Sequence, residues 1–298
     1  MAQCFSSGRA QKEVAMQAEQ TEVRLPVAIG RFYPQNKDQL EEIVPAYLAR
    51  APQKKSALKP WAYVLPHAGY VYCADVIAAA LAGQKLPDTL IILCPNHTGR
   101  GAPFGVWPKG VWRMPLGDYP IAEDIVDRLT AGGLFTKDRL SHLGEHSIEV
   151  LLPFLYYAAG RLPRLVPICV GTRNPNALRA AGQALSALLG ELSALGREVG
   201  LIVSSDMNHY ESHEICMQKD GVALERISAC DPDGLLEVCE RDNITMCGAS
   251  PCAMVLHAAR ELGKFSSDLV AHTSSALASG NYRQTVGYAG LRFYLKSA

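Results

Sequence analysis

Four residues that can bind a transition metal stand where apolar runs of the sequence give way to polar loops. His67 lies in LPHAGY, His97 in LCPNH, His209 in SSDMNH and Cys247 in MCGASP. Imidazole nitrogens and thiolate sulfurs are ligands for zinc, copper and iron. Because these residues recur at the same kind of position, the sequence predicts one site assembled from distant parts of the chain.

Two of the histidines are expected at the carboxyl ends of strands. Residues 61–65 and 89–93 are predicted strands that end just before His67 and His97. In an open α/β sheet, ligands bind beyond the carboxyl ends of the strands, and neighbouring parallel strands lie about 5 Å apart. As neighbours, these two strands would bring both imidazoles to one metal ion. The competing interpretation is a pair of loop histidines that hydrogen-bond to the backbone.

Asp206 and His209 follow a third predicted strand, residues 199–203. His209 is a candidate general acid or base, because imidazole titrates near neutral pH. Asp206 is a candidate for orienting an imidazole or joining a metal's coordination sphere. An aspartate at a strand end also caps the following turn in many proteins, which is the structural alternative.

Cys247 differs from the other cysteines because it lies in a polar loop ahead of a predicted helix, for which Ser250 and Pro251 suit the N-cap and first turn. The field of a helix N-terminus favours the thiolate, the form that binds metal or attacks electrophiles. The alternatives are a thiol nucleophile with His209 as its base and a free loop thiol.

His146 stands in GEHSIE, at the start of a predicted helix over 147–159. Its neighbours Glu145, Ser147 and Glu149 are of types that cap helices, which is their structural interpretation. The functional interpretation is that His146 points into the same cleft as the other histidines.

Strand-like and helix-like patterns alternate along the chain, which predicts an α/β fold: a single three-layer domain with a mixed or mainly parallel central sheet flanked by helices. Residues 1–22 are expected to form a flexible tail and 23–298 the domain. Further strands are predicted at 165–170, 267–272 and 285–294, a long loop at 95–120, and helices at 36–49, 74–82, 122–131, 175–195, 219–228, 232–241 and from 250 to about 263.

Composition excludes several classes of protein. The 298 residues carry a formal net charge of zero, which argues against an electrostatic binder of nucleic acid or membrane surfaces. No stretch reaches the roughly 18–20 apolar residues of a spanning helix, and the N-terminus lacks the apolar core of a signal peptide. Nine cysteines without CxxC spacing indicate reduced thiols, and so a cytoplasmic location.

Taken together and in this order, the motifs resemble the MEMO family, whose prokaryotic members are called AmmeMemoRadiSam system protein B. The resemblance covers roughly residues 24–295. The segments that carry it are GRFYP at 30–34, PHAGY at 66–70, PNH at 95–97, EHSIE at 145–149, SSD with His209 at 204–209, CG at 247–248 and GYAG at 287–290.

The resemblance implies a fold similar to class III extradiol ring-cleaving dioxygenases, which bind Fe(II) through two histidines and a carboxylate. On that resemblance His67 and His97 are the imidazole ligands, and Cys247 supplies a thiol in place of the carboxylate. Asp206 and His209 resemble the neighbouring polar pair, in which His209 is similar to the acid/base histidine of the dioxygenases.

The thiol is a departure from the dioxygenase pattern. It makes the site softer, so that copper and zinc compete with Fe(II) as the expected metal, and the activity does not follow from the fold alone. The family resemblance also implies association with AMMECR-type and radical-SAM proteins in a pathway that acts on a small molecule.

These observations favour an iron-dependent, dioxygenase-like oxidoreductase acting on a small molecule, with His146 and Tyr70 lining its pocket. The alternative is a peptide- or protein-binding module that uses the same cleft. For that function the stretch Trp107–Trp112 is the expected exposed anchor, unless its tryptophans pack on the core. A zinc-dependent hydrolase with a metal-bound water is a third hypothesis.

Overall fold

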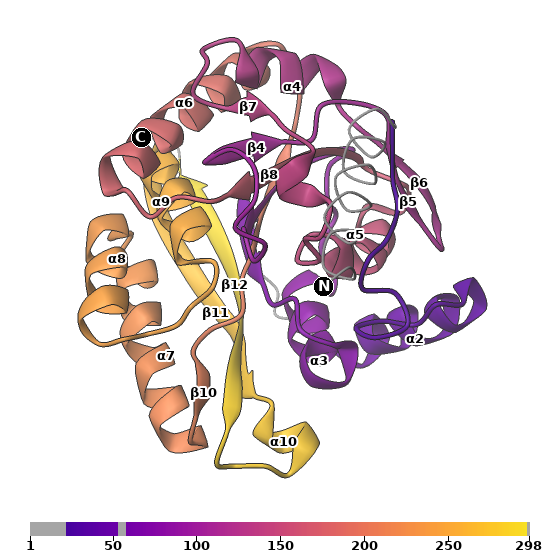
Figure 1. Cartoon of the computed structure of the whole chain (residues 1–298), viewed down its shortest axis with the longest axis vertical. Coiled ribbons are helices and arrows are strands. Elements are labelled where there is room, and N and C mark those ends of the chain that lie inside the picture. The colour runs from indigo at the N-terminus through magenta and orange to yellow at the C-terminus, as the bar shows by residue number, and fades with distance from the viewer. Residues whose placement is uncertain (1–21, 53–57, 297–298) are drawn as a thin grey trace, which may run out of the picture.

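The computed structural model describes residues 22–52 and 58–296, so the predicted tail lies outside the described residues except for Glu22. Within that part of the chain, a large sheet of nine strands carries helices on both faces, and a three-stranded sheet lies beside it (Figure 1). This arrangement confirms the predicted α/β domain with a mixed central sheet between two layers of helices.

The elements alternate along the chain as predicted. The strands are β1 (Val23–Arg24), β2 (Ala62–Leu65), β3 (Thr89–Pro95), β4 (Phe104–Val106), β5 (Val111–Met114), β6 (Gly117–Pro120), β7 (Thr136–Lys137), β8 (Arg164–Val170), β9 (Gly200–Ser204), β10 (His209–Glu211), β11 (Lys264–Ser274) and β12 (Thr285–Lys296). The helices are α2 (Lys37–Arg50), α3 (Tyr70–Leu81), α4 (Glu123–Thr130), η1 (Leu140–His142), η2 (Glu149–Leu151), α5 (Leu152–Ala159), α6 (Pro175–Ala194), α7 (His213–Ser228), α8 (Pro232–Arg241), α9 (Ala249–Leu262) and α10 (Ala276–Ser279).

The large sheet has the strand order β10-β12-β2-β9-β3-β8-β4-β7, and β11 pairs with β12. Strands β2, β9, β3 and β8 are parallel, whereas β12 and β4 run antiparallel to their neighbours in this group. Every residue of β2, β3 and β9 is buried. Continuous burial is expected of parallel strands that are covered on both faces, and it explains why these strands are unbroken apolar runs in the sequence.

Strands β2 and β3 are not neighbours, contrary to the prediction, because β9 pairs with both of them. Leu65 at the end of β2 is level with Ser204 of β9, and Leu93 of β3 is level with Val203. The sequence could not reveal this order, since all three strands are equally apolar. The insertion of β9 places the Asp206 segment between the two histidine segments at one edge of the sheet.

The chain leaves β2 and β9 toward opposite faces of the sheet. After β2 it enters α3, which packs with α2 and α5, whereas after β9 it continues through α7, α8 and α9 on the other face (Figure 1). Where neighbouring parallel strands diverge in this way, a crevice opens beyond their carboxyl ends. The predicted site residues follow these same strand ends.

Several predicted boundaries were wrong. The predicted loop 95–120 contains β4, β5 and β6, whose three or four residues each are too short to give a clear alternating pattern. The predicted helix 147–159 is a 3₁₀ turn followed by α5. Helix α7 begins earlier than predicted, at His213, and α9 begins at Ala249 with Gly248, not Ser250, as its N-cap.

Candidate metal centre

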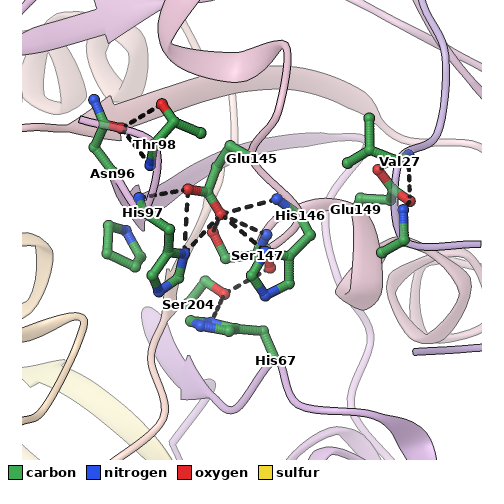
Figure 2. Close-up of polar contacts among 12 residues, drawn as sticks. Val27, His67, Asn96, His97, Thr98, Glu145, His146, Ser147, Glu149 and Ser204 are labelled. Carbon is green, nitrogen blue, oxygen red and sulfur yellow. Dashed lines mark hydrogen bonds and ion pairs between the residues drawn. The ribbon is translucent and has the colours of Figure 1, made fainter. Parts of the chain in front are cut away.

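Three imidazoles meet at the carboxyl edge of the sheet. His67 follows β2, His97 follows β3, and His146 lies between η1 and η2. Each offers one ring nitrogen, and these atoms all lie within 4.8 Å of one another. The ring centroids are 5.3 Å apart for His67 and His97, 5.6 Å for His67 and His146, and 5.0 Å for His97 and His146. Figure 2 shows the three rings converging below Glu145.

The hydrogen bonds of His67 define which of its nitrogens is free. The hydroxyl of Ser204 donates its only hydrogen to the carbonyl of Ser147, at 2.7 Å. That hydroxyl therefore accepts from His67 Nδ1, also at 2.7 Å. With the proton on Nδ1, the lone pair of His67 is on Nε2, the atom that a metal would bind. His67 is almost fully buried, so this arrangement is held away from water.

The carboxylate of Glu145 determines which ring nitrogen of His97 carries the proton. Its oxygens lie 3.0 and 3.2 Å from His97 Nδ1, and one of them accepts the His97 backbone amide at 2.7 Å. An ionised carboxylate only accepts hydrogen bonds, so Nδ1 carries a proton, and in the neutral ring the lone pair is on Nε2. His97 is more exposed to solvent than His67 and His146, which makes its side of the cluster the open one.

Burial and mutual repulsion favour uncharged imidazoles at two of the three positions. Burial lowers the pKa of His67 well below its ordinary value, and the nearby charges of His97 and His146 lower it further. Burial also lowers the pKa of His146, although Glu145 acts in the other direction. For His97, burial is outweighed by the hydrogen bond and charge of Glu145, which raise its pKa. Neutral imidazole is the form that binds metals.

Cys247 lies beside the three imidazoles. Its sulfur is 3.5 Å from His67 Nε2 and accepts the backbone amide of Asp206 at 3.2 Å. Burial raises the pKa of the Cys247 thiol, and the charge of Asp206 raises it further. The predicted low thiol pKa is therefore wrong for the metal-free chain, because desolvation outweighs the field of α9. Binding of a cation would reverse this balance, since a coordinated thiol loses its proton.

Asp206 and His209 flank the cluster but are directed to different partners. Asp206 accepts the backbone amide of His67 at 2.8 Å, and its burial raises its pKa. His209 Nδ1 donates to the carbonyl of Thr245 at 3.0 Å, and the His209 amide donates to the Thr245 hydroxyl at 2.8 Å. In the neutral form of His209 the lone pair is therefore on Nε2, which is the form in which an imidazole acts as a general base.

The donor set fits a transition metal. Three imidazoles within reach of one another, two of them with the free nitrogen fixed by a partner on the opposite ring atom, form a common arrangement for zinc, copper or iron. The Cys247 sulfur lies beside the set, 3.5 Å from His67 Nε2, but it is not one of the atoms that converge within 4.8 Å. Among the described residues, the group that converges there consists of imidazoles and contains no carboxylate oxygen. The arrangement therefore favours these metals over calcium or magnesium.

Comparison with known proteins identifies the family. A family model described as Memo-like protein matches residues 24–292. The chain belongs to the Memo family. Relatives named MEMO1 family protein include one from Sulfurisphaera tokodaii, 36% identical over 284 residues that cover 91% of this chain and 99% of the relative. Another, from Thermotoga neapolitana, is 37% identical over 279 residues that cover 89% of this chain and 98% of the relative.

In this Memo-family chain, Tyr70 lies apart from the cluster. It is the first residue of α3, its hydroxyl donates to the carbonyl of Val150 at 2.9 Å, and its ring packs against Phe154 with the centroids 5.1 Å apart. The aromatic ring of Phe32 contacts the cluster, with its centroid 4.6 Å from that of His146. The motif GRFYP supplied this residue, but nothing in its spacing marked it as part of the site.

The tryptophans predicted as exposed anchors are core residues in this member of the Memo family. Trp107 and Trp112 are completely buried and pack edge to face, with ring centroids 6.1 Å apart. The alternative interpretation, that these tryptophans pack on the core, is therefore confirmed. Within the described residues, no helix is long and apolar enough to cross a bilayer.

Sequence reasoning missed the role of two polar side chains in the Memo-family cluster, Glu145 and Ser204. Glu145 had the structural interpretation of a helix cap, and it does accept the amides of His146 and Ser147 at 2.9 Å. It accepts from His97 as well, which only the fold reveals. Ser204 is the last residue of β9, and its position beside the end of β2 depends on the unpredicted strand order.

Proposed function

We propose that this chain is a metal-dependent enzyme in which His67, His97 and His146 bind one transition-metal ion, with Cys247 as a fourth donor. The observation that carries the proposal is the convergence of three imidazole nitrogens within 4.8 Å of one another. The fixed ring orientation of His67 and His97 supports it, because a histidine whose second nitrogen is held by a partner is typical of metal ligands.

The reaction class that we propose is oxidation of a small molecule, with Fe(II) as the metal. Such a metal supplies redox chemistry and open positions for O₂ and substrate. The chain itself would bind the substrate on the open side of the cluster, beside His97. His209 would take up or return a proton at Nε2, while its Nδ1 stays bound to the Thr245 carbonyl. Asp206 would hold the His67 segment in place through the backbone amide.

A zinc-dependent hydrolase is the second candidate, and the third histidine is the observation that favours it. Three imidazoles with an open fourth position are a common ligand set of catalytic zinc, which lowers the pKa of a bound water to about 7. His209 would again serve as the proton acceptor. The two candidates share the three histidines and His209. They differ in the metal, in the need for O₂ and in Cys247, which in the hydrolase would leave the fourth position to water.

The proposed partners rest on the family resemblance alone. AMMECR-type and radical-SAM proteins would act in the same pathway, and a small-molecule substrate would pass between the enzymes. The candidate anchors for a peptide-binding function, Trp107 and Trp112, are buried and cannot contact a partner. The enzyme therefore has more support than the binding module.

The deciding experiment measures bound metal after purification without oxygen. Elemental mass spectrometry would compare the wild type with His67→Ala, His146→Ala and Cys247→Ser. The matched control is His213→Ala, which removes a partly buried histidine that hydrogen-bonds Ser274 and lies outside the cluster. We expect about one metal ion per chain in the wild type and the control, and loss of metal in both cluster histidine variants.

The identity of the metal then separates the candidates. Iron, with substrate-dependent O₂ uptake, supports the oxidoreductase, whereas stoichiometric zinc supports the hydrolase. A wild-type chain that binds neither iron, copper nor zinc on reconstitution contradicts the proposed function. Retention of metal by folded His146→Ala, with loss in Cys247→Ser, would replace the three-histidine set with two histidines and a thiol.

A further inference from the structure

We infer that Glu145 is the positioning residue of this centre: its carboxylate sets the tautomer and direction of His97 and fixes the turn that carries His146. The inference deepens the proposed function, since positioning matters for catalysis only if the imidazoles bind a metal. Figure 2 shows Glu145 between the two histidines, with its oxygens directed at both segments.

The contacts of Glu145 divide between its two oxygens. One oxygen accepts the backbone amide of His97 at 2.7 Å. The other accepts the His97 ring at 3.0 Å, the amides of His146 and Ser147 at 2.9 Å, and the Ser147 hydroxyl at 2.6 Å. One side chain therefore joins the loop after β3 to the turn before η2. These two segments carry two of the three proposed ligands.

Because the Glu145 carboxylate is buried, losing these hydrogen bonds would destabilise the folded chain. Glu145 is 1% exposed, and a buried carboxylate is stable only if it is paired and hydrogen-bonded. In the described part of the chain, its ion-pair partners are His97 at 3.0 Å and His146 at 3.6 Å, with no lysine or arginine among them. Arg24 reaches the Glu145 backbone carbonyl and not its carboxylate. The Glu145 carboxylate is thus stabilised by hydrogen bonds from the site itself, including those from the His97 ring and from the backbone amides of His97 and His146.

Glu149 provides an internal comparison, because it is also buried and lies four residues further along the chain. Its carboxylate pairs with Arg24 at 2.7 Å and accepts from the hydroxyl of Tyr33 and the amides of Val27 and Ala28. Among the described residues, its hydrogen-bond and ion-pair partners include no imidazole. A structural glutamate here is therefore paired with arginine, whereas Glu145 is paired with histidines.

A test that needs no metal reads the tautomer of His97 directly. In ¹⁵N-histidine-labelled, metal-free wild type near pH 8, long-range ¹H–¹⁵N NMR spectra should show His97 with its proton on Nδ1. In Glu145→Gln, the new amide group must face an N–H donor of His97, His146 or Ser147, so the His97 signals should shift or show mixed tautomers. Glu149→Gln should leave the His97 signals unchanged.

A second test measures affinity for Co(II), whose visible spectrum reports ligand geometry. We expect Glu145→Gln to bind Co(II) about 10–100-fold more weakly than wild type, with an altered spectrum. Glu149→Gln should keep the wild-type affinity and spectrum, even if it lowers the unfolding temperature.

The outcomes separate the two proposals. Wild-type His97 protonated on Nε2 overturns the positioning role, and so does a folded Glu145→Gln that binds Co(II) as wild type does. If wild type binds no Co(II), the proposed function fails, while the NMR result still decides whether Glu145 sets the tautomer. If Glu145→Gln does not fold, the wild-type tautomer alone decides.

Discussion

The three imidazoles differ in what holds them. His67 is nearly fully buried and donates to a hydroxyl, whereas His97 is exposed and donates to a carboxylate. His146 is intermediate in exposure, and the ring of Phe32 packs against its ring. A buried ligand with a neutral partner and an exposed ligand with a charged partner respond oppositely to pH, since burial lowers the pKa of His67 and Glu145 raises that of His97.

Mild acid should destabilise the metal-free chain. His67 and His146 have lowered pKa values in the folded state, so below about pH 6.5 the unfolded chain binds more protons at these positions. Stability then falls as pH falls, by about 1.4 kcal/mol per pH unit for each imidazole that titrates only when unfolded. His97 opposes this trend, because its raised pKa makes its contribution largest below pH 6.5.

Urea unfolding at pH 5.5, 6.5 and 7.5 measures this slope. His67→Asn is the matched variant, because its amide can still donate to Ser204 while it no longer titrates. We expect the variant to have a flatter dependence of unfolding free energy on pH than wild type. Equal slopes would mean that His67 is not held neutral by the fold.

At the scale of elements, the site depends on a turn that the N-terminal segment holds in place. Arg24 of β1 is buried, donates to the carbonyls of His142 and Glu145, and pairs with Glu149. Its guanidinium also lies 4.1 Å from the centre of the Trp112 ring. A single side chain therefore fixes the segment 142–149, which carries His146.

Replacing Arg24 should be far more damaging than replacing a surface arginine. Arg24→Met leaves the Glu149 carboxylate buried without its cation, which is expected to cost about 3–5 kcal/mol. Arg50 is the matched control, since its pair with Asp75 is solvent-exposed and worth about 0–1 kcal/mol. Urea unfolding of Arg24→Met and Arg50→Met gives both values. Similar losses would contradict the role assigned to the buried pair.

The sequence predicted the positions of the strands along the chain better than it predicted which strands pair with one another in the sheet. The strands before His67, His97 and Asp206 were recognisable because strands buried on both faces are continuous apolar runs. The position of β9 between β2 and β3 was not recognisable from the sequence, because strand pairing is decided by crossover direction and packing. The roles of Glu145 and Ser204 depend on that packing, so they emerged only with the structure.

At the scale of the whole molecule, the centre joins segments that are far apart in the chain. His67 and Cys247 are 180 residues apart in sequence and come within 3.5 Å. They arrive from opposite directions, His67 from the strand that leads into α3 and Cys247 from the loop between α8 and α9. A site of this kind does not exist in the unfolded chain, so metal binding is coupled to folding of the entire domain.

Metal should therefore raise the unfolding temperature of the whole domain. A ligand that binds only the folded state adds about 2.7 kcal/mol at 100 times its Kd, which corresponds to roughly 5 °C for a domain of this size. Differential scanning calorimetry with Co(II), against the same protein with a chelator, measures the shift. His213→Ala should show the full shift and His97→Ala little of it. An undiminished shift in His97→Ala would place the metal elsewhere, because His97 is the exposed ligand whose loss disturbs the core least while removing one donor of three.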